Sequence, residues 1–299
     1  MTSASARRLG VACVLLSAVL FSAKSVLVKL AYQYPVEAET LLALRMLFSL
    51  PFFLGMLWFA HEPAPHLGWR DFLGVFLAGS AGYWGASILD FAGLNYIGAS
   101  LERLLLFMYP TLTVFLSALF LKTPITGRTW AAIGISYAGM AMVFAGDSGT
   151  GAPHLWLGSL LVFGGALAYA GYLVSSSVLM QAFGAARFTG LALTVATGCS
   201  LTHFAVSHPL SVLRGLPTPL WMLSAALGFF CTFLPASLMT QGIRHIGAPK
   251  AALIGAIGPV FTLILGAIFL DEHLRMSQMA GGLLIIGGVV LISFRPREE

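Results

Sequence analysis

The chain has 299 residues, of which 58% are hydrophobic and only 9% are charged, and its mean hydropathy is +0.90. An average soluble domain is roughly 45–50% apolar and about 25% charged, so this composition excludes a soluble globular protein. The formal charge of +5 comes from 16 lysine and arginine residues against 11 acidic ones. In so weakly charged a chain, this excess is typical of asymmetric membrane loops and not of a nucleic-acid groove.

The N-terminal segment predicts a first membrane span. Arg7 and Arg8 precede an apolar run from Leu9 through Ala31, which is too long for a signal peptide and lacks a suitable cleavage site. We therefore expect this span to remain uncleaved and the arginine pair to set its orientation. The cysteines Cys13, Cys199 and Cys231 lie far apart in apolar stretches, which predicts neither a disulfide framework nor a metal site.

Ten stretches are long and apolar enough to cross a hydrocarbon core, which takes about 20 residues. Their predicted boundaries are Leu9 to Ala31, Glu39 to Ala60, Asp71 to Ala92, Tyr96 to Leu121, Arg128 to Ala145, Leu155 to Met180, Phe188 to Val206, Leu220 to Gln241, Lys250 to Leu270 and Ser277 to Phe294. The separators are short and rich in Gly and Pro, so none of them holds a soluble domain.

The loop charges predict the orientation of these spans. Ten of the basic residues lie in loops on the side of the N-terminus, and only Arg214 and Arg275 lie in loops on the other side. Cytoplasmic loops carry the excess of lysine and arginine, so both termini are expected in the cytoplasm. The four remaining basic residues fall inside spans, and they are Lys24, Lys29, Arg45 and Arg103.

The chain repeats itself with a shift of 149 residues. This shift aligns Gly93, Ile97, Gly98, Ala99, Pro110, Thr113, Leu116, Phe120, Leu121 and Gly139 with Gly242, Ile246, Gly247, Ala248, Pro259, Thr262, Leu265, Phe269, Leu270 and Gly288. We expect two repeats, residues 1–146 and 147–299, with five spans each. An odd number of spans makes the second repeat enter the membrane from the opposite side, and such inverted repeats are typical of alternating-access carriers.

A family resemblance rests on the second repeat, in the segments from Ile246 to Pro249, from Gly258 to Thr262, from Phe269 to Glu272 and from Gly281 to Val289. These segments resemble the EamA-type drug/metabolite transporter superfamily. The segment from Tyr96 to Pro110 and the aromatic central spans are similar to its inner-membrane amino-acid exporters, including the aromatic amino acid and methyl viologen exporter.

The resemblance implies an all-α integral membrane protein of the bacterial inner membrane. It implies ten transmembrane helices in two inverted five-helix repeats around a central cavity, which the first four helices of each half line. Arg103 and Tyr109 lie within the exporter-like segment and are counted among the cavity residues. The superfamily also contains drug, sugar-nucleotide and metabolite carriers, so the resemblance leaves the substrate open.

Charges inside the spans are costly, at about 2.5–3.5 kcal/mol each at a helix centre, and such groups face a cavity or a partner. Lys24 lies deep in the first span, whereas Arg45 either faces inward or extends to the outer interface. Glu102 and Arg103 point about 100° apart on a helix, so one is expected to face the cavity and the other a neighbouring helix, with Asp90 or Glu39 as partner. The positive sum favours a substrate with a carboxylate, unless these groups only neutralise one another.

Aromatic residues near the middle of spans form the second candidate set. Tyr83 and Trp84 lie in the third span, Tyr169 and Tyr172 share one face of the sixth, and Phe233 lies in the eighth. We expect them to shape an apolar pocket, although ordinary helix packing is the alternative for each. Pro110 and Pro259 occupy matching positions, where they act as a gate or hinge or mark a packing bend shared through the duplication.

These patterns predict a carrier that exports amino acids, including aromatic or apolar ones, by alternating access, with Lys24 holding the substrate carboxylate. A multidrug or other small-metabolite exporter is the alternative, and an integral-membrane enzyme is a remote one because the spans carry no catalytic motif. No cofactor, metal or nucleic acid is expected. The scarcity of acids in the spans favours uniport over proton exchange.

Overall fold

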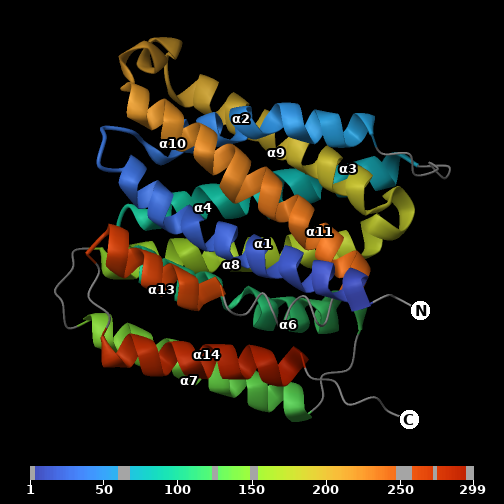
Figure 1. Cartoon of the computed structure of the whole chain (residues 1–299), viewed down its shortest axis with the longest axis vertical. Helices are drawn as coiled ribbons and strands as arrows, with labels where there is room; N and C mark the ends of the chain where they lie inside the picture. Colours follow the sequence, from blue (N-terminus) through green and yellow to red (C-terminus); the bar gives the residue numbers. More distant parts are fainter. Residues whose placement is uncertain are drawn as a thin grey trace.

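The computed structural model describes residues 4–59, 68–122, 127–148, 154–246, 258–271 and 275–293, and every regular element in them is a helix (Figure 1). The helices are α1 (Ala4–Ala31), α2 (Ala38–Trp58), α3 (Trp69–Leu77), η1 (Ala78–Gly85), α4 (Ala86–Leu94), α5 (Ala99–Leu106), α6 (Tyr109–Leu121), α7 (Gly127–Ser148), α8 (Leu155–Phe183), α9 (Ala185–Ser207), η2 (Leu210–Gly215), α10 (Thr218–Gly228), η3 (Phe229–Phe233), α11 (Leu234–Ile246), α13 (Gly258–Phe269) and α14 (Met276–Ser293).

Seven helical stretches in these residues are long and apolar enough to cross a membrane. They run over 8–31, 38–58, 69–94, 99–121, 155–183, 186–207 and 218–239, so they coincide with seven of the predicted spans. The helices α7, α13 and α14 lie in the other three, but residues 250–257 and Phe294, at the edges of two of these spans, fall outside the described residues. A helix satisfies its own backbone hydrogen bonds in lipid, which is why an apolar chain of this kind folds entirely into helices.

The distribution of side chains is that of a membrane protein. Large apolar groups such as Trp58, Phe120 and Leu283 are exposed on the outside. Small polar groups lie in the interior, where the hydroxyl of Ser17 donates to the carbonyl of Pro235 at 2.7 Å and that of Ser49 to the carbonyl of Gly228 at 3.0 Å. Hydroxyl groups of this kind join helices where apolar contact alone gives no drive to associate.

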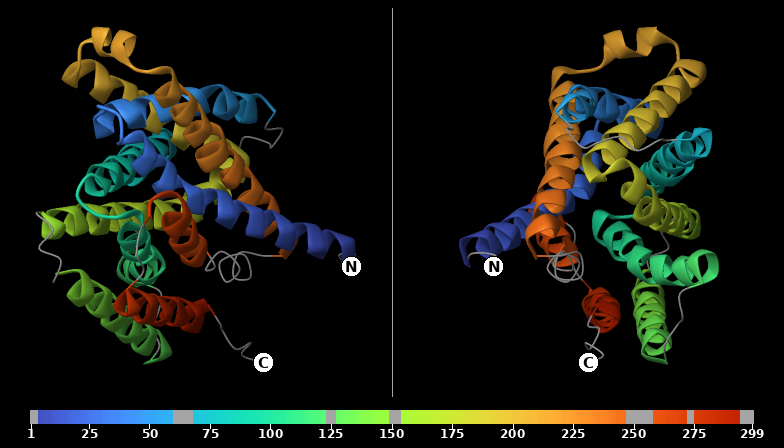
Figure 2. Two further views of the ribbon diagram at one scale, coloured as in Figure 1. Left: turned by 60° about the vertical axis from the view of Figure 1, so that its left-hand side comes forward. Right: turned by 90° about the vertical axis from the view of Figure 1, so that its right-hand side faces the viewer.

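Helices that are distant in the sequence pack against each other throughout the bundle. The N-terminal helix α1 packs on α11 and α13, α2 packs on α9, and α4 packs on α8. The helices α7 and α14 pack mainly on each other and form a separate pair at one end of the molecule (Figures 1 and 2). Each of these contacts joins a helix of the first half of the chain to one of the second.

Two spans contain a π-helical segment at corresponding places. The third span holds η1, and the eighth holds η3. The shift of 149 residues places Trp84, near the end of η1, opposite Phe233, the last residue of η3. Pro235 follows η3 and lacks the backbone donor of a regular helix, which accounts for the local widening there. π-Helical turns often occur at functional sites.

The fourth predicted span is interrupted. Its first part, α5, ends at Leu106 and its second part, α6, begins at Tyr109, so Pro110 is the second residue of α6. Pro259 is likewise the second residue of α13. Proline fits the first turn of a helix because the amide hydrogen it lacks has no partner there. Pro110 thus lies in the first turn of α6, whereas the residues that precede Gly258 lie outside the described part of the chain.

Candidate functional site

A buried cluster of charged side chains joins α1, α4 and α5. The ammonium group of Lys24 lies 2.5 Å from Oδ2 of Asp90 and 3.2 Å from Oε1 of Glu102. The hydroxyl of Ser25 donates to Oε2 of Glu102 at 2.5 Å. All four residues are buried, and we call them the acid–lysine cluster.

The packing of three helices brings these side chains together. Lys24 and Ser25 are neighbours in the second half of α1, while Asp90 and Glu102 lie on either side of the short connection between α4 and α5. The helix α1 thus contributes the cation and a hydroxyl donor, and α4 and α5 each contribute one carboxylate to the same cluster. A buried charge requires such partners, because its desolvation costs several kcal/mol.

This arrangement changes the role expected for Lys24. The sequence predicts that its ammonium group is available to a substrate carboxylate, but in the structure two carboxylates of the protein already hold it. Its partners explain how a lysine is tolerated in the middle of an apolar span.

The sequence left two alternatives for Arg45, which either faces inward or extends to the outer interface. In the structure it faces inward. It is buried, its Nη2 donates to the hydroxyl of Ser87 at 3.1 Å, and its guanidinium carbon lies 4.7 Å from the centre of the Phe91 ring. The arginine is therefore held inside the bundle by a hydrogen bond and a cation–π contact.

Arg103 points away from Glu102, as their separation on the helix predicts. A Cβ added to Gly258, the first residue of α13, would lie 2.8 Å from Nη2 of Arg103. Within the described part of the chain no carboxylate forms an ion pair with Arg103, and its Nε is buried without a hydrogen-bond partner. The guanidinium group therefore retains donors for a ligand.

Four tyrosines form a continuous row of rings that ends at Tyr109, the first residue of the helix that follows Arg103 in the chain. The ring centres are 5.6 Å apart for Tyr83 and Tyr172, 5.8 Å for Tyr172 and Tyr169, and 5.2 Å for Tyr169 and Tyr109. The row runs from η1 across α8 to α6. We call these four residues the tyrosine row.

The other two predicted aromatic residues lie elsewhere. The ring of Trp84 is 5.5 Å from that of His203, and the ring of Phe233 stacks on Phe52 at 5.0 Å. The structure therefore divides the predicted aromatic set, with four tyrosines beside Arg103 and two residues in separate packing contacts.

Sequence reasoning missed some polar members of these sites. Ser25 and Ser87 are small hydroxyl residues in apolar helices, and only the folded structure shows that they bond to Glu102 and Arg45. Asp90 was expected only as a partner, but in the structure it makes the shorter of the two contacts with Lys24.

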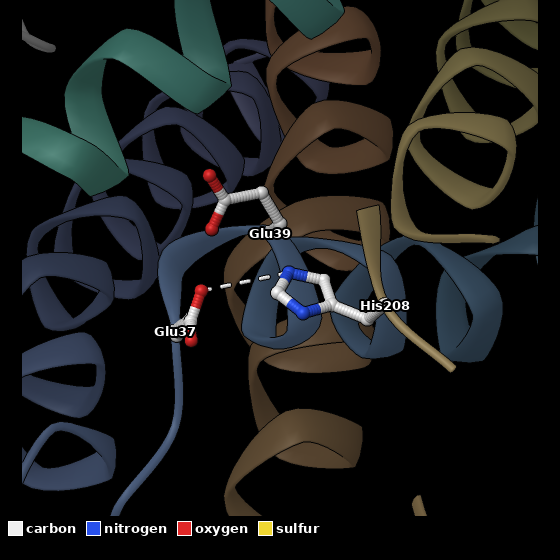
Figure 3. A group of neighbouring side chains, drawn as sticks. All are labelled: Glu37, Glu39 and His208. Atoms are coloured by element: carbon white, nitrogen blue, oxygen red, sulfur yellow. Dashed lines mark ion pairs between the residues drawn. The ribbon is translucent and has the colours of Figure 1, made fainter. Parts of the chain in front are cut away.

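A third polar group lies near the ends of α2 and α9. Glu37, Glu39 and His208 each offer a ligand atom, and these atoms lie within 4.8 Å of one another (Figure 3). His208 Nε2 is 3.6 Å from Glu37 Oε2, whose side chain is 72% exposed. The set has the composition of a metal site that the sequence did not predict, yet exposed acidic groups of this kind commonly lie together without an ion.

Tyr32 follows α1 directly and packs against the apolar core that includes Phe91. Its hydroxyl donates to the carbonyl of Phe91 at 2.7 Å. Burial raises the pKa of Tyr32 well above its usual value, so the hydroxyl stays protonated and keeps this hydrogen bond.

Comparison with known proteins finds a match to the model of the EamA-like transporter family twice along the chain, at residues 8–145 and 156–294. The uncharacterized transporter YcbK of Bacillus subtilis is 29% identical over 293 residues, which cover 95% of this chain and 91% of YcbK.

Two further proteins are similar to this chain, one over about a third of its length and one in fold alone. A probable terminal-alkyne amino-acid exporter of Streptantibioticus cattleyicolor is 33% identical over 106 residues, which cover 35% of each chain. A protein of known crystal structure aligns with a TM-score of 0.66 and covers 96% of both chains at 17% identity, which shows likeness of fold alone.

Proposed function

Since this chain belongs to the EamA-like transporter family, and is thus a multi-pass membrane transporter of small molecules, we propose that it exports amino acids with aromatic or apolar side chains. The observation that carries the proposal is Arg103, a half-buried cation that pairs with no carboxylate among the described residues and that lies on α5, one turn before the break that leads to Tyr109 of the tyrosine row. Relatives named as transporters agree with transport as its activity.

In this proposal Arg103 and the tyrosine row form the two halves of an amino-acid site. A guanidinium group binds a carboxylate through two parallel hydrogen bonds. The rings of Tyr109 and Tyr169, 5.2 Å apart, offer an apolar and aromatic surface for a side chain. In this proposal Arg103 takes the carboxylate-binding role that the sequence assigns to Lys24.

Partial similarity to one exporter supports this substrate class. The protein of Streptantibioticus cattleyicolor is named for amino-acid export, and it matches this chain over about a third of its length. This match is consistent with the proposal, which rests mainly on Arg103 and the tyrosine row.

The transport cycle we propose is alternating access between two inverted repeats of five spans. Supporting it are the shift of 149 residues, which aligns Pro110 with Pro259, and the corresponding π-helical segments η1 and η3. In this proposal both termini lie in the cytoplasm, which the excess of basic residues in loops on the side of the N-terminus supports. The bundle lies in a bacterial inner membrane, which the bacterial relatives support.

Flux measured in proteoliposomes tests the substrate. We expect labelled phenylalanine to exchange across the membrane and phenethylamine, which lacks the carboxylate, to compete at least about ten-fold less well, since a charge-assisted pair is worth about 1.5–3 kcal/mol. Arg103→Gln should lower the affinity for phenylalanine to a similar extent, whereas Arg214→Gln, at an exposed arginine of η2, should not.

Two results would contradict the proposal. Equal competition by phenylalanine and phenethylamine would favour an exporter of apolar cations or drugs with the same fold. Unchanged affinity in Arg103→Gln, with the Arg214→Gln control also unchanged, would remove Arg103 from the site.

A further inference from the structure

The group formed by Glu37, Glu39 and His208 joins two helices from different halves of the chain. Glu37 directly precedes α2, Glu39 lies in the first turn of α2, and His208 directly follows α9. The packing of α2 on α9 brings one ligand atom from each side chain within 4.8 Å of the others (Figure 3). We call these three residues the glutamate–histidine group, and none of them belongs to the acid–lysine cluster or the tyrosine row.

The imidazole of His208 distinguishes this group from an ordinary set of surface acids. Its Nε2 is buried and has no hydrogen-bond partner among the described residues, since the 3.6 Å to Oε2 of Glu37 is longer than a hydrogen bond. A buried polar atom without a partner is costly, and such atoms are rare in folded proteins. Figure 3 shows this nitrogen facing the carboxylate of Glu37, with that of Glu39 on the same side. The unsatisfied nitrogen therefore points to a ligand held together with the two carboxylates.

The end of α9 holds the ring of His208 in this direction. The amide of His208 donates to the carbonyl of Phe204 at 2.8 Å, and the two rings stack with their centres 5.6 Å apart. Pro209 follows, and a residue before proline favours extended backbone, which His208 adopts with φ of −134° and ψ of 141°. The ring is therefore placed before any ligand binds, which lowers the entropic cost of binding.

The spacing of the ligand atoms suits a tetrahedral metal ion. Zinc binds histidine nitrogens and carboxylate oxygens at about 2.0–2.2 Å, so two ligand atoms on one ion lie roughly 3.4 Å apart. Nε2 of His208 and Oε2 of Glu37 lie 3.6 Å apart, close to this value. The other separations are at most 4.8 Å, and the side chain of Glu37, which is 72% exposed, has room to rotate and shorten them.

We propose that the glutamate–histidine group binds a zinc ion that joins the start of α2 to the end of α9. Two carboxylates balance the charge of a divalent cation. The imidazole favours zinc over magnesium and calcium, which take oxygen ligands. Since α1 runs from the N-terminus to the end of the bundle where α2 begins (Figure 1), the site lies on the side opposite the N-terminus. In the proposed orientation this side faces the outside of the cell.

Zinc binding to the purified full chain in detergent, without a histidine tag, tests this site. Equilibrium dialysis should find one zinc ion per chain, retained in a large excess of magnesium. His208→Asn removes Nε2 and should weaken zinc binding at least about ten-fold, since even partners outside the ligand shell are worth about 10–100-fold in metal affinity. The matched control is His154→Asn, at an exposed histidine that precedes α8, and it should bind zinc like the wild type.

A second variant keeps the test decisive if His208→Asn fails to fold. Glu37→Gln changes an exposed side chain, so it should fold normally and bind zinc at least about ten-fold more weakly. Zinc should also raise the melting temperature of the wild type, because an ion that binds the folded chain stabilises it. The same rise in Glu37→Gln should need a zinc concentration about ten-fold higher or more.

Three results would overturn the assignment. One is the absence of zinc from the dialysed wild type. Another is an unchanged zinc affinity in folded His208→Asn or in Glu37→Gln. The third is displacement of zinc by an equal concentration of magnesium, which would mark an ordinary acidic surface. None of these results bears on the proposed export of amino acids, which rests on Arg103 and the tyrosine row.

Discussion

The ammonium group of Lys24 lies 2.5 Å from a carboxylate oxygen of Asp90, so an ion pair joins α1 to α4 in the apolar interior of the bundle. The residues are 66 positions apart in the chain, and Glu102 adds a second carboxylate from α5. Charges that are each unfavourable in a membrane are thus made tolerable by one another.

Removing single members of this cluster should destabilise the protein unequally. Lys24→Met leaves two buried carboxylates without a cation and should cost about 3–5 kcal/mol, whereas Asp90→Asn leaves Lys24 paired with Glu102 and should cost less. The double variant should cost less than the sum of the two. Thermal unfolding in detergent measures all three, and additive losses would show that the pair does not interact.

The tyrosine row should contribute to affinity through its rings. Tyr169→Phe keeps the ring and should change the KM for phenylalanine little, whereas Tyr169→Ala should raise it about two- to ten-fold, from the 0.5–1.5 kcal/mol that aromatic pairs contribute. Tyr137→Ala, at an exposed tyrosine of α7, is the control. Equal effects of Tyr169→Ala and Tyr137→Ala would indicate that the row does not contact substrate.

A methyl group at Gly258 should disturb the site without changing its charge. The added Cβ would lie 2.8 Å from Nη2 of Arg103, so the flexible guanidinium must move aside. We expect Gly258→Ala to raise the KM several-fold with little effect on stability, since misplacing a binding group weakens its contacts. Gly287→Ala, where nothing lies within 4 Å, should leave both unchanged.

The pair formed by α7 and α14 should depend on close backbone contact. A Cβ on Gly139 would lie 2.6 Å from the carbonyl oxygen of Gly281, and this backbone atom cannot move aside as a flexible side chain can. Gly139→Ala should therefore cost about 1–3 kcal/mol, as overpacking does, while Gly134→Ala, in open space on the same helix, should not.

Transport separates this structural role from a functional one. Neither α7 nor α14 carries a residue of the acid–lysine cluster or the tyrosine row. Reconstituted Gly139→Ala protein that remains folded should exchange phenylalanine at the wild-type rate. A loss of exchange in folded protein would place this pair of helices in the transport cycle.

Much of the architecture follows from local properties of the chain. An apolar stretch of about 20 residues must form a helix in lipid because its backbone has no other hydrogen-bond partners. The span edges predicted at Ala31, Leu121 and Leu155 agree with the helix ends of the structure. The break before Pro110 was likewise readable, since proline lacks the amide hydrogen that a continuous helix uses.

The partners of the buried charges were not readable in the same way. Helical periodicity predicts that Glu102 and Arg103 diverge, and they do, but it says nothing about which distant helix each side chain meets. The prediction of uniport rested on the small number of acidic residues in the spans. The structure brings Asp90 and Glu102 to one ammonium group, a contact that the number of acids in the spans does not reveal.

By itself the sequence determined that this protein is a helical membrane transporter of the EamA-like family, because composition, span length and motif are properties of contiguous residues. Only the tertiary structure decided that Lys24 is held by two carboxylates while Arg103 pairs with no carboxylate of the described residues. The physical reason is that the interaction of charges depends on distance and burial. Helices far apart in the chain set both of these when they pack.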